Sequence, residues 1–306
     1  MNARLNELMA SWAMEPGADI QAQIPALLES LQAVGLLRAS ACAVLLGEQY
    51  HLGGEEDTRR MAHALDLTAA DRVLDLACYV GGPARQLARD YGCRVTGVDI
   101  SEDCIAIAEK LTQLCGMAGD KSPTLHSNGD GALLPNVQVI CCSADAVPLP
   151  DESFTVAWSQ CSFPSDLSWL PEIRRLLAPG GRLGFTGVIR RSELADPSRY
   201  SLDELRDRVA AFGFRVISAE DISEMDLEHG WYPAKRKLQE NEKHYSRLMG
   251  EAWVRQAYAE LDSDIGSWRS GREANTRVVA VKPDPAGARS GNPLWEPRPR
   301  GDQGAD

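Results

Sequence analysis

The chain has 306 residues, of which 44% are hydrophobic, and a formal net charge of −12. This composition can build a buried core, which excludes a globally disordered chain, and the length allows one large α/β domain with a cap, or two domains. The acidic balance argues against a protein that binds nucleic acid or an anionic membrane surface, because both need clustered Lys and Arg.

The N-terminal residues contain no continuous apolar run that resembles a signal peptide. No apolar segment reaches the roughly 20 residues that a membrane-spanning helix needs, so we expect a cytoplasmic protein. The eight cysteines are then expected to be reduced, with Cys141 and Cys142 buried in an apolar strand. No Cys-x-x-Cys pair is present and the five histidines are scattered, so the sequence predicts no metal site.

Residues 1–54 are predicted to form an N-terminal helical lid. Ile24, Leu27, Leu28 and Leu31 follow the i, i+3, i+4, i+7 spacing of one apolar helix face. A Gly-Gly pair at 53–54 marks a break, and residues 55–67 favour a helix that leads into the first strand. The lid therefore precedes the sheet and is not part of it.

Strands and helices alternate through a predicted α/β core at 55–223. The expected strands are 72–77, 94–99, 137–143, 154–159, 182–188 and 215–220, with a last core strand inside 273–283. The expected helices are 83–91, 102–115 with Ser101 as its cap, 168–177 and 202–212. This alternation predicts an α/β fold with a doubly wound, mostly parallel, seven-stranded sheet and helices on both faces.

Three further segments lie outside that alternation. Residues 116–135 read as a surface loop, and residues 284–306, rich in Pro, Gly and Arg, as a disordered tail. Residues 224–272 form a predicted helical cap insert before the last strand, rich in Trp and Tyr. Its aromatic side chains could pack the insert onto the sheet, line a substrate pocket, or support a homo-oligomer.

The segment 71–84 reads as a buried strand, a Gly-containing turn and a helix start, and 95–101 as a second strand with an acidic end. Asp99 follows Asp75 by 24 residues, close to the roughly 20-residue spacing of a ribose-binding carboxylate. Open α/β sheets bind ligands at the carboxyl ends of their strands. The sequence therefore predicts a nucleotide-like ligand beside Asp99.

Taken together, these segments resemble the class I S-adenosylmethionine-dependent methyltransferases, in particular the small-molecule branch of glycine, sarcosine, dimethylglycine and sterol methyltransferases. The matching segments are Gln-Tyr-His-Leu-Gly-Gly at 49–54, Val-Leu-Asp-Leu at 73–76, Gly-Gly-Pro-Ala-Arg at 81–85, Val-Asp at 98–99, Ser-Ala-Asp-Ala at 143–146 and Leu-Ala-Pro-Gly-Gly-Arg-Leu at 177–183. The resemblance implies a Rossmann-like fold, S-adenosyl-L-methionine as cofactor and a small-molecule methyl acceptor, with a nitrogen slightly favoured as the accepting atom.

The resemblance also implies a set of cofactor contacts. Asp99 would accept both ribose hydroxyls, Asp145 the adenine amino group, and the backbone of Ala146 would meet a ring nitrogen. The full set of expected cofactor-binding residues is Tyr50, His51, Asp75, Ala77, Tyr79, Gly81, Asp99, Ile100, Asp145, Ala146 and Gln160.

Residues near the transferred methyl group are expected from the segment around His51 and from the end of the fourth strand. His51 could act as a base or a hydrogen-bond donor on the acceptor side, or simply bond to the backbone, and Gln160 could hold a polar acceptor. The expected substrate-contacting residues are Tyr79, Cys161, Phe163, Trp231 and Tyr232, the last two covering the acceptor or a cationic product. A thiol pair of Cys78 and Cys161 would suit a soft acceptor.

The chain departs from the family at its glycine motif. The family's acidic-x-Gly-x-Gly-x-Gly pattern here holds Ala77, Tyr79 and Gly81. The Tyr79 ring could point outward, form a wall of an unusual active site, or block the cofactor and leave a non-catalytic relative. A nicotinamide-dependent oxidoreductase is a further alternative, although residues 77–82 lack the G-x-G-x-x-G fingerprint that it would need.

Overall fold

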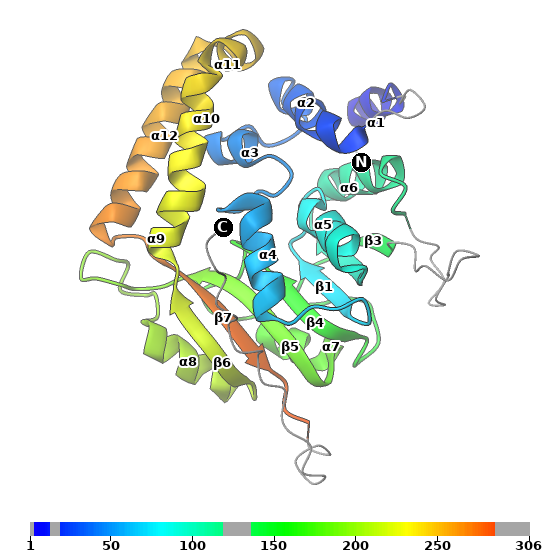
Figure 1. Ribbon diagram of the computed structural model, residues 1–306, viewed down its shortest axis with the longest axis vertical. Coiled ribbons are helices and arrows are strands. Elements are labelled where there is room, and N and C mark those ends of the chain that lie inside the picture. The colour runs from blue at the N-terminus through cyan, green and yellow to red at the C-terminus, as the bar shows by residue number, and fades with distance from the viewer. Residues whose placement is uncertain (1–2, 13–18, 119–135, 285–306) are drawn as a thin grey trace, which may run out of the picture.

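The computed structural model describes residues 3–12, 19–118 and 136–284 (Figure 1). Most of the expected loop at 116–135 and nearly all of the expected tail at 284–306 lie outside these residues. The strands are β1 (Arg72–Leu76), β2 (Arg94–Asp99), β3 (Asn136–Cys141), β4 (Phe154–Ser159), β5 (Leu177–Val188), β6 (Arg215–Asp221) and β7 (Asn275–Val281). They form one seven-stranded sheet in the order β3-β2-β1-β4-β5-β7-β6.

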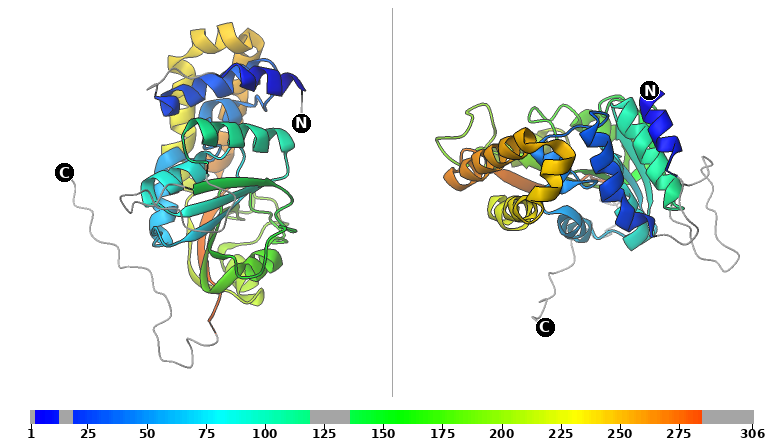
Figure 2. Two further views of the ribbon diagram at one scale, coloured as in Figure 1. Left: turned by 90° about the vertical axis from the view of Figure 1, so that its right-hand side faces the viewer. Right: turned by 90° about the horizontal axis from the view of Figure 1, so that it is seen from above.

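The sheet is parallel from β3 to β5, and β7 runs antiparallel to both β5 and β6. The helix α4 (Gly54–Ala64) precedes β1, and the helices that connect strands are α5 (Gly82–Tyr91), α6 (Glu102–Leu114), α7 (Leu170–Leu176) and α8 (Leu202–Ala211). Parallel strands need crossover connections, which place these helices on both faces (Figure 2). The predicted doubly wound α/β fold is therefore confirmed, and Ser101 caps α6 as expected.

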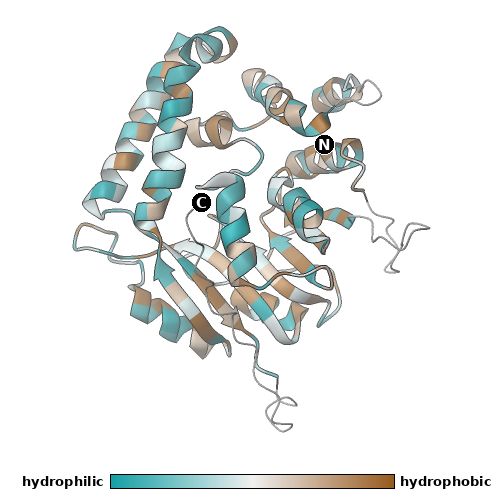
Figure 3. Cartoon of the chain, in the orientation of Figure 1, coloured by the Kyte–Doolittle hydropathy of each residue, from teal (hydrophilic) through white to brown (hydrophobic). Residues whose placement is uncertain are grey.

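Two apolar clusters cover the two faces of the sheet. On one face Ile173 of α7 and Val209 of α8 pack with Leu183 of β5, and all three side chains are fully buried. On the other face Met61 of α4 and Leu87 of α5 pack with strand residues. Figure 3 shows hydrophobic residues along the strands and hydrophilic ones along much of α4 and α11. Burial of both faces holds the carboxyl ends of β1, β2 and β4 in a fixed arrangement.

The remaining helices gather above the carboxyl-end edge of the sheet (Figures 1 and 2). The lid comprises α1 (Ala3–Ala10), α2 (Ile20–Ala33) and α3 (Ala41–Leu46), and the cap comprises α9 (Ser223–Asp226), the π-helical turn Leu227–Trp231, α10 (Tyr232–Glu240), α11 (Glu242–Met249) and α12 (Glu251–Ser270). Trp253 Nε1 of the cap donates to the Ala39 carbonyl at 2.6 Å, and Glu260 accepts from the Ala41 amide at 3.0 Å. Lid and cap are thus joined directly to each other over the sheet.

Two details differ from the sequence-based expectation. Cys141 is exposed and Cys142 is only half-buried, because they lie at the end of β3, the edge strand of the sheet. The strand β5 begins at Leu177 and includes the turn that was expected to precede it. Within the described ranges, every helix is too short or too polar to cross a lipid bilayer.

Candidate functional site

The turn after β1 keeps the backbone of a glycine motif although two of its positions carry side chains. The φ angles are 57° at Ala77, 51° at Tyr79 and 77° at Gly81, all in the left-handed region. A non-glycine residue there costs roughly 1–2 kcal/mol, so the surrounding structure must impose this conformation. The Tyr79 amide donates to Asp99 Oδ2 at 3.0 Å and the Cys78 amide to the Val98 carbonyl at 3.0 Å. An alanine in place of the family's glycine costs little free energy only where φ is negative, and φ at Ala77 is positive.

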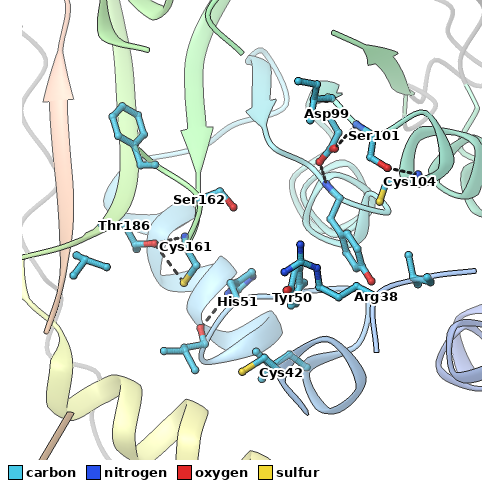
Figure 4. A pocket seen from close by; sticks show the side chains of 18 of the residues that line it. Arg38, Cys42, Tyr50, His51, Asp99, Ser101, Cys104, Cys161, Ser162 and Thr186 are labelled. Atoms are coloured by element: carbon cyan, nitrogen blue, oxygen red, sulfur yellow. Dashed lines mark hydrogen bonds between the residues drawn. The ribbon is translucent and has the colours of Figure 1, made fainter. Parts of the chain in front are cut away.

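Asp99 lies at the carboxyl end of β2 and holds two loops at once. Besides the Tyr79 amide, its carboxylate accepts the Ser101 amide at 2.9 Å through Oδ1 (Figure 4). Each carboxylate oxygen has a second lone pair for a ligand hydroxyl. The following residue, Ile100, is 77% exposed and offers an apolar surface next to the carboxylate. Asp99 is therefore placed to receive a sugar diol beside a flat apolar group.

Asp75 of β1 is a buried acid with an unsatisfied oxygen. The side chain is 3% exposed, and Oδ2 has no hydrogen-bond partner among the described residues. Burial, and then the charge of Asp99 on the neighbouring strand, raise the pKa of Asp75 to about 8. Burying an acid without a partner is costly, so this position is suited to a ligand that brings a positive charge.

Two adjoining cavities occupy this edge of the sheet, with volumes of about 850 Å³ and about 20 Å³. Asp99 and Ile100 line the large cavity, whereas Asp75 and Ala77 line the small one. Tyr79 lines both. Tyr79 therefore forms a wall shared by the two cavities and also packs partly against the apolar cluster of α1, α2 and α6, and the three outcomes considered for its ring remain predictions.

Tyr50 completes this wall from the segment between α3 and α4. Its ring packs on that of Tyr79, with centroids 4.7 Å apart and planes at 42°. Tyr50 also lines both cavities and has a φ of 43°. The two rings thus stand where the large cavity meets the small one, each on a strained backbone.

The segment that carries Tyr50 is anchored to α5. Glu48 forms a buried ion pair with Arg85, which is 1% exposed and also donates to the Val80 carbonyl at 2.8 Å. The first residue of α5 must be glycine, because a Cβ at Gly82 would lie 2.3 Å from the Glu48 carbonyl oxygen. Lid and glycine turn are therefore held in direct contact.

His51 and Gln160 lie in a buried polar network. His51 Nδ1 bonds to the Leu52 carbonyl at 3.0 Å and Nε2 to Thr58 Oγ1 at 3.0 Å (Figure 4 shows the first bond). Gln160 Nε2 donates to Asp57 Oδ2 at 2.9 Å. Asp57 in turn is paired with the buried guanidinium of Arg277. Burial lowers the pKa of His51, so the ring is neutral near pH 7.

Three predicted substrate residues, Cys161, Phe163 and Trp231, line the large cavity opposite Asp99. Phe163 stacks on Phe185 with centroids 4.0 Å apart, which fixes its ring. Trp231 contacts Trp268 edge-on at 5.3 Å. Trp231 and Trp268 therefore line the cavity, whereas Tyr245 and Trp253 pack the insert against the lid and not, as one expectation had it, onto the sheet.

Some predicted residues do not line either cavity. Tyr232 is 42% exposed, because it follows Trp231 by one helical position and so points to another side of the helix. Gly81 instead is the N-cap residue that precedes α5. Asp145 and Ala146 lie in the turn after β3, where Asp145 is exposed and accepts from Ser143 Oγ at 2.5 Å. Their contact with adenine remains a prediction.

Cys78 and Cys161, the thiol pair considered for a soft acceptor, line different cavities. Cys78 lies over Gly97 of β2, where a Cβ would meet its Sγ at 2.7 Å, and lines only the small cavity. Cys161 lines only the large one, together with Cys42 of α3.

Sequence reasoning missed Thr186 and Asn275, which line the large cavity from β5 and β7. The end of β5 could have been found from the rule that ligands bind at strand carboxyl ends. Asn275 could not, since it begins its strand and reaches this edge only because β7 is antiparallel.

The fold and this site define a Rossmann-like α/β protein whose ligand site lies at the carboxyl ends of the parallel strands. The residues fit S-adenosylmethionine: Asp99 suits its ribose, the unsatisfied Asp75 suits its amino group, and the adjoining large cavity leaves room for an acceptor. The packed rings of Tyr50 and Tyr79 lie where the two cavities meet.

Comparison with known proteins gives a consistent result. Residues 74–185 match the family described as "Methyltransferase domain". The 27-O-demethylrifamycin SV methyltransferase of Amycolatopsis mediterranei is 31% identical, over 78% of this chain and 92% of its own. A sterol 24-C-methyltransferase of Eremothecium gossypii is 28% identical over 77% of this chain, and a glycine/sarcosine/dimethylglycine N-methyltransferase of Actinopolyspora halophila 30% identical over 72%. The chain spans 61% and 38% of the lengths of these last two relatives.

A solved structure agrees on the fold. Phosphoethanolamine N-methyltransferase 2 of Haemonchus contortus, in complex with phosphomonomethylethanolamine and S-adenosylhomocysteine, superposes with a TM-score of 0.69 at 18% identity, covering 83% of this chain and 59% of that one. The chain belongs to the family of S-adenosylmethionine-dependent methyltransferases. The expected family, fold class and cofactor are confirmed.

Proposed function

We propose that the protein transfers a methyl group from S-adenosylmethionine to a small-molecule acceptor that binds at the cap end of the large cavity. The observation that carries the proposal is the continuity of this cavity from Asp99 to Trp231 past Tyr50 and His51. When bound, the cofactor supplies a methyl group on a positively charged sulfur. Asp99 would hold the ribose hydroxyls, Asp75 would face the amino group, and lid and cap would exclude water.

His51 and Gln160 are proposed as positioning residues. With Nδ1 donating to the Leu52 carbonyl, the neutral ring of His51 uses Nε2 as an acceptor for Thr58. Gln160 is likewise engaged with Asp57. Both side chains therefore bond to α4, through which the Tyr50 segment is joined to the end of β4. Methyl transfer needs alignment of acceptor and donor more than a strong base, so this role is sufficient.

The accepting atom is proposed to be nitrogen, on the resemblance to glycine-type enzymes. The names of the relatives include carbon, nitrogen and oxygen acceptors, so the test needs substrates that differ only in the accepting atom. We would incubate the full chain with methyl-labelled S-adenosylmethionine and either 4-propylaniline or 4-propylphenol, which differ only in the accepting atom.

We expect one S-adenosylhomocysteine to form for each methylated product. The amount of methylated product should be larger with 4-propylaniline than with 4-propylphenol. Preference for the phenol would move the acceptor to oxygen. Cofactor binding without transfer to any acceptor would instead support the non-catalytic alternative. Family membership does not favour the alternative of a nicotinamide-dependent oxidoreductase. Titration of the chain with NADH tests that alternative independently, by measuring whether NADH binds.

A further inference from the structure

Charge is distributed unevenly along the large cavity. Among the described residues that line it, the charged side chains are Arg38, Asp99 and Asp103, and all lie at the cofactor end. The opposite end, formed by α3, the ends of β4, β5 and β7, and the cap, carries uncharged side chains only. Its apolar and sulfur-bearing wall consists of Cys42, Leu46, Phe163, Val188, Trp231 and Trp268.

Ionisable groups beneath this wall are already engaged. Asp226 of α9 accepts from Asn275 Nδ2 at 3.0 Å, and burial raises its pKa to about 7. Asp57 is paired with Arg277 and bonded to Gln160. His51, on the side towards the cofactor, is buried and neutral. None of these three groups is therefore placed to balance the charge of an acceptor. Asp264 and Glu260 of α12 contribute, after burial, to the raised pKa of Cys42, so they lie near the wall and would repel an anion.

Besides the hydroxyl of Ser162 and the indole N–H groups of Trp231 and Trp268, the wall offers the neutral polar groups of Asn275 and Thr186. Asn275 uses one amide hydrogen for Asp226, and its Oδ1 accepts the Thr276 amide at 3.1 Å, which leaves one N–H. Thr186 Oγ1 accepts the Cys161 amide at 2.7 Å and has a second lone pair. Together they can bind a single uncharged hydroxyl, amine or carbonyl group.

An aromatic wall without a counter-charge binds neutral, apolar ligands much more tightly than anionic ones. Burying a carboxylate or phosphate without a partner is costly, whereas an apolar body gains free energy in proportion to the area it buries. The Trp231 and Phe163 rings are held by neighbouring rings, so this surface exists before the acceptor arrives.

We infer that the acceptor is an uncharged, largely apolar molecule, whose aromatic or aliphatic body packs on Trp231, Trp268 and Phe163 and whose single polar group bonds to Asn275 and Thr186. The inference rests on the proposed function and narrows its substrate class. Free amino acids and phosphorylated amines are poor acceptors for this cavity.

The first test compares three probes that share one ring and differ in charge: 4-propylphenol, 3-(4-hydroxyphenyl)propanoate and 2-(4-hydroxyphenyl)ethylammonium. Each is titrated calorimetrically into the full chain saturated with S-adenosylhomocysteine. The neutral phenol is expected to bind at least tenfold more tightly than either ion. Equal or tighter binding of the carboxylate overturns the inference, as does tightest binding of the ammonium ion, which would indicate an aromatic box for cations. Absence of binding by all three also overturns it.

The second test places a counter-charge in the wall. Val188→Arg is expected to raise the affinity for the carboxylate probe above that for the phenol, while the neutral control Val188→Gln keeps the wild-type order. An unchanged order in Val188→Arg would show that the acceptor does not bind at this end. Failure of S-adenosylhomocysteine to bind the wild-type chain would count against the proposed function itself, so the two failures are distinguishable.

Discussion

The two ends of the large cavity are built in opposite ways. At the cofactor end, the turn between β1 and α5 meets the end of β2, with a left-handed backbone at Tyr79 and its amide bonded to Asp99. At the acceptor end, side chains from the lid, three strands and the cap meet, such as Cys42, Phe163 and Trp268. The first end depends on backbone geometry and charge, and the second on apolar surface. Substitutions should therefore affect cofactor and acceptor separately.

The largest effect is expected from Asp99→Asn. The carboxylate joins the glycine turn to the start of α6 and is proposed to bind the ribose, and hydrogen bonds to a charged group contribute about 1.5–3 kcal/mol each. We expect the affinity for S-adenosylhomocysteine to fall about 100-fold in calorimetry. Glu102→Gln, an exposed acid in the first turn of α6, serves as the control. An Asp99→Asn variant of unchanged affinity would remove Asp99 from the cofactor site.

The pH dependence of cofactor binding tests the role of Asp75. Its pKa of about 8 means that the acid is mostly protonated at pH 6 in the cofactor-free protein, while a cationic ligand group favours the carboxylate. Binding of S-adenosylhomocysteine should then release a proton from Asp75. The affinity for S-adenosylhomocysteine should therefore rise roughly tenfold from pH 6 to pH 7 and level off above about pH 8. In Asp75→Asn this dependence should disappear. The same slope in both proteins would show that another group titrates.

Tyr79→Gly tests the aromatic wall between the cavities. Glycine removes both the ring and the strain at a φ of 51°. We expect about tenfold tighter binding of S-adenosylhomocysteine because loss of the ring adds space where the cavities meet. Relief of roughly 1–2 kcal/mol of strain should separately raise the free energy of unfolding. Tyr79→Phe, which keeps the ring, should match the wild type. Weaker binding by Tyr79→Gly would mean that the ring supports the cofactor.

The smallest effect is expected from Trp268→Ala at the acceptor end. Loss of this ring should raise the KM for 4-propylaniline about fivefold, in line with the roughly 0.5–1.5 kcal/mol of an aromatic contact, without altering affinity for S-adenosylhomocysteine. Tyr232→Ala removes an exposed aromatic residue of the same insert and should change neither quantity. An equal change of KM in Trp268→Ala and Tyr232→Ala would show that Trp268 does not contact the acceptor, which contradicts the assignment of the two ends of the cavity.

The sequence predicted the cofactor end better than the acceptor end for a physical reason. Strand periodicity and the spacing of Asp75 and Asp99 are local, and the structure has both strands within a residue of the expected bounds. The left-handed backbone at Ala77 and Tyr79 was not predictable, because it is imposed by contacts with β2. Thr186 and Asn275 meet only through the antiparallel pairing of β5 with β7, which no local pattern encodes.

A crystal structure of the full chain with S-adenosylhomocysteine tests the central claim most directly. The account predicts that the Asp99 carboxylate binds the ribose hydroxyls, that the amino group lies beside Asp75, and that the cap end lined by Trp231 and Trp268 stays free for an acceptor. A ligand bound at the cap end, or one that leaves Asp75 and Asp99 without contact, would contradict it.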